Sequence, residues 1–148
     1  MICTWTGISN DVKKHLQTAH KELCEDYNAQ DLLFLSSSIA LNYRYNFLFA
    51  YNEIFFYSLI IHRETIYVFV YYIGPAENDS KYQYKVMVMN NEATESVVVT
   101  RPIRSFTEAE DYNFIPKNCL RLHRELTESF RNEKGELTVL MEILRVGD

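Results

Sequence analysis

Three side chains near the N-terminus have types and spacing suited to binding a metal ion. Cys3, His15 and His20 form the pattern C-x11-H-x4-H. Thiolate and imidazole are the usual ligands of structural zinc, and two histidines about one helical turn apart face a common point. Such a site needs four ligands, and this pattern supplies three. Cys24 offers a fourth if the chain folds back after His20; the opposing interpretation is an ordinary helix with a terminal thiol.

No other group of residues in the sequence indicates catalysis. The remaining histidines, His62 and His123, belong to no nucleophile motif, which favours ordinary surface roles. The carboxylates Glu108, Glu110 and Asp111 are more typical of a solvated acidic run than of a catalytic pair. With only 4 glycines, neither of the common glycine-rich phosphate loops can be written. Nucleotide-driven chemistry is therefore not expected.

Composition points to one soluble, β-rich domain with a small appendage. The 148 residues are 47% hydrophobic and include 9 Phe and 11 Tyr, which suit half-buried strands. A net charge of −5 argues against nucleic acid, whose phosphates need a basic surface. The charged N-terminal region resembles neither a signal peptide nor a membrane anchor. Three cysteines at no disulfide-like spacing suit a reducing compartment, so we expect a cytoplasmic protein, with the nucleus as the alternative.

The hydrophobic pattern predicts a short helix followed by a series of strands. Residues 9–23 have the helical stripe Val12, Leu16, Ala19 and Leu23, with cap candidates before it. The stretch after it, 24–31, is polar and linker-like. Eight strand-length runs then follow, which are Leu32–Leu41, Tyr45–Tyr51, Ile54–His62, Thr65–Ile73, Tyr82–Met89, Ser96–Ile103, Cys119–Leu122 and Leu137–Arg145.

The connections between these runs favour an antiparallel sandwich. Arg63-Glu64 and Asn90-Asn91 are turn candidates, and links this short join antiparallel neighbours. The stretch 104–117 is a long irregular exception, followed by a helical turn near 125–130. Met87 and Met89 make the second face of their strand partly apolar, which indicates either a covered face or a dimer contact.

One strand alternates aromatic and polar residues in a way that suggests a groove. The rings of Tyr45, Phe47 and Phe49 share one side with Tyr43, while Asn46 shares the other with Arg44 and Leu48. The same spacing is also that of an ordinary core face. Exposure in a structure distinguishes the two interpretations.

Several stretches together resemble the substrate-binding region of seven-in-absentia (Sina/Siah) ubiquitin ligases. Cys3-Thr-Trp-Thr-Gly followed by the two histidines resembles the end of the family's second zinc finger. Further matches, spread along the chain, are Asp31–Leu35 with Ile39 and Leu41, Arg104-Ser-Phe-x-Glu108, Asn118–Leu120, Phe130, and Gly135-x-Leu137 through Ile143. The resemblance implies that 1–24 is the end of a finger and that 25–148 is an eight-stranded TRAF-like β-sandwich. The missing zinc ligand, the first finger and the RING would then lie upstream.

The resemblance also implies what the domain binds. Family members hold an extended Val-x-Pro peptide beside a sandwich edge by β-augmentation, and a ubiquitin-conjugating enzyme binds their RING. The matching positions here are Tyr45, Asn46, Phe47 and Phe49, with Cys24 and Asp26 opposite. The family has Val-Asp-Trp where Tyr45-Asn46-Phe47 stand, so an altered peptide preference is expected. Structural zinc, homodimerisation and degradation of bound targets are implied in the same way, with no activity in this part alone.

Two other functions remain open from the sequence. One is an adaptor or scaffold that keeps the sandwich and lacks the ligase, which a search for RING cysteines upstream would distinguish. The other is a small-ligand carrier, in which a closed β-barrel surrounds an apolar cavity.

Overall fold

The computed structural model describes residues 3–26, 33–37, 43–108 and 116–147. Strand is the most frequent secondary structure among these residues, and the strands form two sheets with both antiparallel and parallel pairs, which is consistent with the predicted all-β class. Ten strands are present among the described residues where eight were predicted, because the short strands β1 and β8 fall in stretches without strand-length patterns. Among the described residues, no helix is both long and apolar enough to cross a membrane.

The first sheet has the strand order β1-β3-β4-β5-β8, with β9 also paired to β5. Its antiparallel centre is the meander β3-β4-β5, while β1 and β8 join it by parallel pairing to β3 and β5. These strands are β1 (Cys24–Asp26), β3 (Tyr43–Ala50), β4 (Glu53–His62), β5 (Thr65–Tyr72), β8 (Arg104–Ser105) and β9 (Leu120–Leu122).

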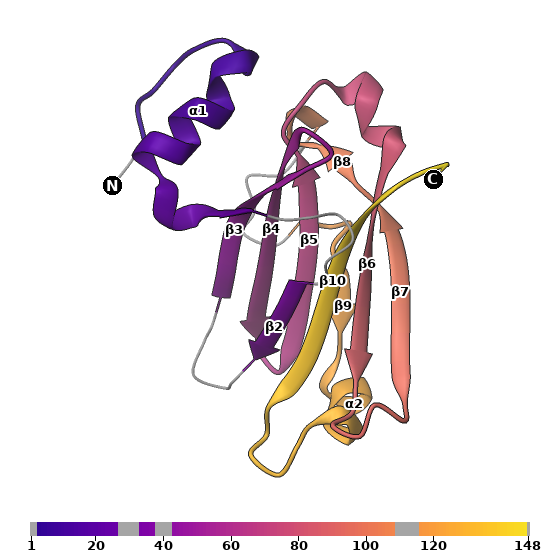
Figure 1. Ribbon diagram of the computed structural model, residues 1–148. Helices are drawn as coiled ribbons and strands as arrows, with labels where there is room; N and C mark the ends of the chain where they lie inside the picture. The colour runs from indigo at the N-terminus through magenta and orange to yellow at the C-terminus, as the bar shows by residue number, and fades with distance from the viewer. Residues whose placement is uncertain (1–2, 27–32, 38–42, 109–115, 148) are drawn as a thin grey trace.

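The second sheet is antiparallel and has the order β2-β10-β6-β7. Figure 1 shows β10, in yellow, crossing over the strands of the first sheet. Its members are β2 (Leu33–Ser37), β10 (Leu137–Arg145), β6 (Tyr82–Met89) and β7 (Ser96–Pro102). The described strands form two separate sheets and no closed barrel. This argues against the small-ligand carrier, which requires a closed barrel around a cavity.

Two tight hairpin turns connect the meander. Tyr51 and Asn52 have φ angles of 53° and 59°, and Arg63 and Glu64 have φ angles of 47° and 66°. Positive φ at both central residues is the geometry of two-residue turns that match strand twist. The Arg63-Glu64 turn was predicted from the sequence, and it aligns β4 with β5 so that His62 pairs with Thr65.

The helical segments are short and lie outside the two sheets. The predicted helix 9–23 ends earlier, because α1 (Ser9–Ala19) gives way to η1 (Lys21–Leu23) and then directly to β1. The linker predicted for 24–31 is thus a strand over Cys24–Asp26, and its remainder lies outside the described residues. The other segments are η2 (Ala76–Lys81), η3 (Phe106–Glu108), α2 (Arg124–Thr127) and η4 (Glu128–Phe130).

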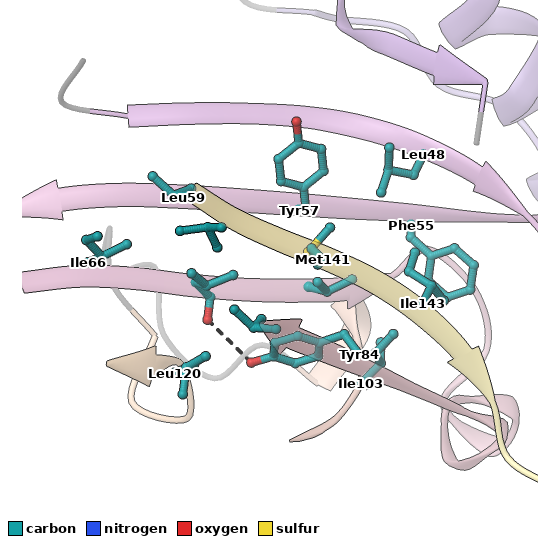
Figure 2. Packing of buried hydrophobic residues seen from close by; sticks show 14 of the residues in the cluster. Leu48, Phe55, Tyr57, Leu59, Ile66, Tyr84, Ile103, Leu120, Met141 and Ile143 are labelled. Carbon is teal, nitrogen blue, oxygen red and sulfur yellow. Dashed lines mark hydrogen bonds between the residues drawn. The ribbon is translucent and has the colours of Figure 1, made fainter. Parts of the chain in front are cut away.

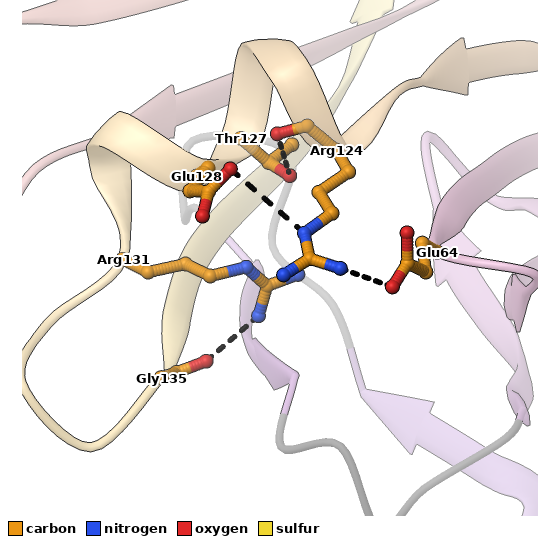
Figure 3. A network of polar contacts seen from close by, with 6 residues as sticks. All are labelled: Glu64, Arg124, Thr127, Glu128, Arg131 and Gly135. Atoms are coloured by element: carbon orange, nitrogen blue, oxygen red, sulfur yellow. Dashed lines mark hydrogen bonds and ion pairs between the residues drawn. The ribbon is translucent and has the colours of Figure 1, made fainter.

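Arg124 connects α2 to the β4–β5 turn. Its guanidinium forms an ion pair with Glu64 and lies 3.8 Å from the Glu128 carboxylate (Figure 3). Arg131 donates a 2.7 Å hydrogen bond to the Gly135 carbonyl and closes the following turn. These ion pairs are exposed and contribute little stability each, so their role is to orient α2.

The main core lies between the two sheets. Met141 and Ile143 of β10 point at Tyr57 and Phe55 of β4, and all four are fully buried (Figure 2). Strand β6 alternates buried and half-buried residues. Strand β5 is apolar along both faces in sequence, yet it alternates as well, and its outward rings remain half-exposed.

Candidate functional site

The predicted metal ligands converge beside α1. The ligand atoms of Cys3, His15 and His20 all lie within 4.8 Å of one another, and Cys3 Sγ is 3.3 Å from His15 Nε2. His15 projects from α1, His20 caps its C-terminus, and Cys3 reaches them from the preceding extended segment. The spacing noted in the sequence therefore becomes a three-residue cluster in space.

A tryptophan orients one of these imidazoles. The Trp5 ring stacks on His15 with centroids 4.5 Å apart and planes 10° from parallel. Gly7 permits the chain to pass over this indole, because a Cβ at Gly7 would lie 2.2 Å from the Trp5 ring. The Cys3-Thr-Trp-Thr-Gly segment thus has a packing reason for both its tryptophan and its glycine.

Thiolate and imidazole are the side-chain types that zinc prefers in structural sites. Ligand distances of about 2.0–2.3 Å place neighbouring donor atoms roughly 3.5 Å apart. The Cys3 Sγ–His15 Nε2 distance is close to this value, while the cluster as a whole extends to 4.8 Å. Cys24 does not join the cluster, and its thiol donates to the His20 carbonyl at 3.3 Å.

The N-terminal segment with α1 is attached to the first sheet by a second, smaller core. Leu16 of α1 packs with Phe49 of β3 and Ile54 of β4, and Phe47 packs against the same group. The Lys13 ammonium lies 5.2 Å from the Phe49 ring centroid, in a cation–π arrangement. Placement of the Cys3, His15 and His20 cluster is therefore coupled to the strand that carries the predicted peptide-binding residues.

The predicted peptide-binding residues of β3 differ in their exposure to solvent. Tyr45 is 38% exposed and contacts Phe56, Phe47 is half-buried against the same Phe56, and Phe49 is buried beneath α1. Asn46 lies on the opposite face of β3, in register with the buried Tyr57. An accessible aromatic surface thus includes Tyr45 and Phe47, whereas Phe49 belongs to the small core.

Strand β1 lies beside β3 as the resemblance implied, in parallel register. Cys24 pairs with Phe47, and Asp26 pairs with Phe49. In the strand order of the described sheet, β1 is the terminal member. Cys24 also contacts the small core beneath α1.

Sequence reasoning missed Glu25, the middle residue of β1. The Asn46 amide donates to its carboxylate, and Arg44 Nη2 lies 3.4 Å from the same oxygen. Tyr57 points its hydroxyl toward β3 (Figure 2), and this buried hydroxyl has no hydrogen-bond partner among the described residues. Only the pairing of β1 with β3 brings Glu25 close to Asn46 and Arg44, so no local sequence pattern predicted this contact.

Burial, reinforced by the Glu25 carboxylate, raises the pKa of Tyr57 to about 12. A phenol whose pKa is higher in the folded state than its usual value of 10.0 stabilises the fold fully below pH 10.0. This contribution is lost as the pH rises through the folded pKa, since only the unfolded state releases the proton in that window. We expect stability to fall between these pH values, and Tyr57→Phe to make the decline shallower. Urea titrations at successive pH values measure this, and an unchanged slope in Tyr57→Phe would exclude Tyr57 as a source.

The methionines that suggested a second interface lie on the outer face of the second sheet. Val86 and Val88 face the core, while Met87 and Met89 are half-exposed. Val98, paired with Met87 in the register, is 48% exposed. This face is partly apolar as expected, and the homodimer stays a prediction.

Comparison with known proteins adds no relative. A scan against protein-family models and a search of curated proteins each returned no match.

Proposed function

We propose that this chain is the substrate-recognition module of a RING-type ubiquitin ligase with a TRAF-like sandwich of the seven-in-absentia kind. It would hold extended peptides of target proteins for ubiquitination and degradation. The observation that carries this proposal is a short terminal strand, β1, next to an accessible aromatic surface on β3. A peptide-binding domain of this type needs both a strand edge and side-chain contacts beside it.

The peptide would extend the first sheet at its β1–β3 end. Main-chain hydrogen bonds to an edge give affinity with little sequence dependence, and alternate side chains of the peptide give selectivity. Tyr45 and Phe47, which both contact Phe56, supply apolar surface for those side chains. Rings of this kind contribute strongly to binding because they bury a large area at low entropic cost.

Asn46 and Glu25 supply the basis for a changed preference. Where the family pattern has a carboxylate, Asn46 has an amide, and this amide is engaged by Glu25. The negative charge is thus retained at this end of the sheet, moved to β1 and paired with Arg44. A peptide with a donor placed for the family's carboxylate would meet a different geometry.

Replacement of Phe47 by alanine is expected to weaken peptide binding about tenfold or more. Isothermal titration calorimetry with Val-x-Pro peptides measures this directly, and capture of partners from lysate extends it to altered motifs. Tyr67→Ala is the matched control, since Tyr67 is a half-exposed ring on the same outer face, two strands away on β5. No binding of any Val-x-Pro peptide together with undiminished partner capture by Phe47→Ala would overturn the proposal.

Zinc forms part of the proposal as a structural ion. Cys3, His15 and His20 would hold it, and it would tie the N-terminal segment to α1. The proximity of one thiol and two imidazoles, within 4.8 Å of one another, supports this role.

An adaptor without ligase activity is the second candidate function, because the same sandwich would serve it. Ubiquitin transfer by the full-length gene product, in the presence of a conjugating enzyme, distinguishes the two. Self-ubiquitination supports the ligase, and its absence with intact peptide binding supports the adaptor.

A further inference from the structure

A small pocket opens at the side of the molecule away from β1 and β3. Its volume is about 170 Å³, and it lies where β5 of the first sheet approaches β7 of the second. Its walls are Phe69, Val70, Tyr71, Tyr84, Arg101 and Arg104, with Pro102, Pro116 and Asn118.

Two arginines give this pocket its chemical character. Arg101 lies on β7 in register with the buried Tyr84, so it is on the core-facing side of an edge strand, and Arg104 begins β8. Neither guanidinium forms a hydrogen bond or ion pair with any other residue that the structure describes. The neighbouring Arg121 is engaged, since it donates to the carbonyls of Lys117 and Cys119. Two cations without a described counter-charge thus line one pocket in a protein of net charge −5.

A buried polar network holds one of these arginines in place. The amide of Ser105, next to Arg104, donates to the buried Asp79 carboxylate at 2.9 Å. The Ser105 hydroxyl donates to the Gly74 carbonyl at 2.6 Å. The backbone that carries Arg104 is therefore fixed independently of any ligand, while the Arg104 side chain is exposed.

The remaining walls are rigid and uncharged. Tyr84 donates its hydroxyl to the Val68 carbonyl at 3.3 Å, and burial raises the pKa of Tyr84 to about 12, so it remains neutral. Phe69 and Tyr71 pack edge to face with centroids 5.5 Å apart. Apolar rings beside a guanidinium lower the local polarity, which strengthens the attraction between the guanidinium and an anion.

The volume and the charges together define the class of ligand. Pockets for drug-sized molecules have volumes of roughly 300–1,000 Å³, so this one accommodates only a side chain or a small ion. Guanidinium groups bind carboxylates and phosphates through charged hydrogen bonds. We infer that this pocket binds an anionic side chain, a carboxylate or a phosphorylated residue, presented by a partner protein. This site is separate from the β1–β3 end, and it does not depend on the proposed peptide-binding function.

The test uses the full chain and probes of known structure. Short capped peptides of neutral residues carry one central Asp, phosphoserine or serine, and inorganic phosphate serves as the free anion. Amide chemical shifts in ¹⁵N-labelled protein locate binding, with the largest changes expected along β5 and β7. The Asp and phosphoserine peptides distinguish the two sources of negative charge, and the serine peptide should not bind.

Arg101→Gln and Arg104→Gln are each expected to weaken binding at least about tenfold. Arg63→Gln is the matched control, because it removes the same charge from the exposed β4–β5 turn and should leave affinity unchanged. Unchanged dispersion of the amide spectrum shows that each variant remains folded.

Three results would overturn the inference. The first is an equal loss of affinity in Arg63→Gln, which would indicate general charge attraction. The second is binding of phosphate with no binding of either anionic peptide, which would exclude a partner side chain. The third is the absence of shift changes with every anionic probe.

Discussion

Phe55→Ala is expected to lower the free energy of unfolding by about 3–5 kcal/mol, a large share of the stability of a domain of this size. Phe55 is fully buried on β4, and its ring lies 5.1 Å from that of Tyr82 on β6 and 5.7 Å from that of Tyr72 on β5. The ring therefore connects the two sheets. Its removal leaves a cavity that the surrounding strands cannot fill, because the hydrogen bonds within each sheet hold those strands in place. Urea unfolding followed by circular dichroism measures the loss.

The matched control is Phe106→Ala. Phe106 is 58% exposed and contacts Tyr71 edge to face at 5.9 Å, so its replacement should change stability by no more than about 1 kcal/mol. Comparable losses in the two variants would contradict a core placed between the sheets at Phe55.

Zinc binding is expected to depend on Cys3 and to be independent of Cys24. Cys3→Ser should weaken zinc affinity at least about a hundredfold, because hydroxyl is a much poorer zinc ligand than thiolate and only two of the clustered donors would remain. Competition with a chromophoric chelator measures the affinity. Zinc should also raise the midpoint of thermal unfolding for the unaltered chain, since an ion that binds only the folded state stabilises it.

Cys24→Ser is the control for this prediction. The Cys24 thiol donates to the His20 carbonyl, a contact that a serine hydroxyl is able to replace, so zinc affinity should persist. Loss of affinity in both variants would identify Cys24 as a fourth ligand and contradict the three-donor geometry. Equal, weak zinc binding by Cys3→Ser and the unaltered chain would exclude a site at this cluster.

The periodicity of the sequence predicted the principal strands, because side chains that alternate between core and solvent leave a local pattern. The alternation of Tyr82–Met89 appears as β6, and the aromatic alternation around Tyr45 and Phe47 appears as β3. The same pattern did not distinguish β5, where both faces are apolar in sequence and one remains half-exposed. An aromatic side chain suits a core and a binding surface equally, so sequence alone did not separate the two.

Local spacing also predicted which residues are able to bind a metal, since His15 and His20 are neighbours on or beside one helix. The spacing did not predict that Cys3 lies close to His15, because this contact depends on how the extended segment with Trp5 folds back onto α1. Exclusion of Cys24 likewise depends on the turn at η1, which directs the chain into β1.

The amino-acid sequence by itself thus determined the β-rich class, the main strands, one hairpin turn and the proximity of His15 to His20, because each of these is encoded within a few neighbouring positions. Tertiary structure alone decided that Glu25 meets Asn46 across β1 and β3, that Phe49 is buried under α1, and that Arg101 and Arg104 share a pocket. The physical reason is that these contacts depend on strand pairing and on the packing of distant segments. No short window of sequence carries that information.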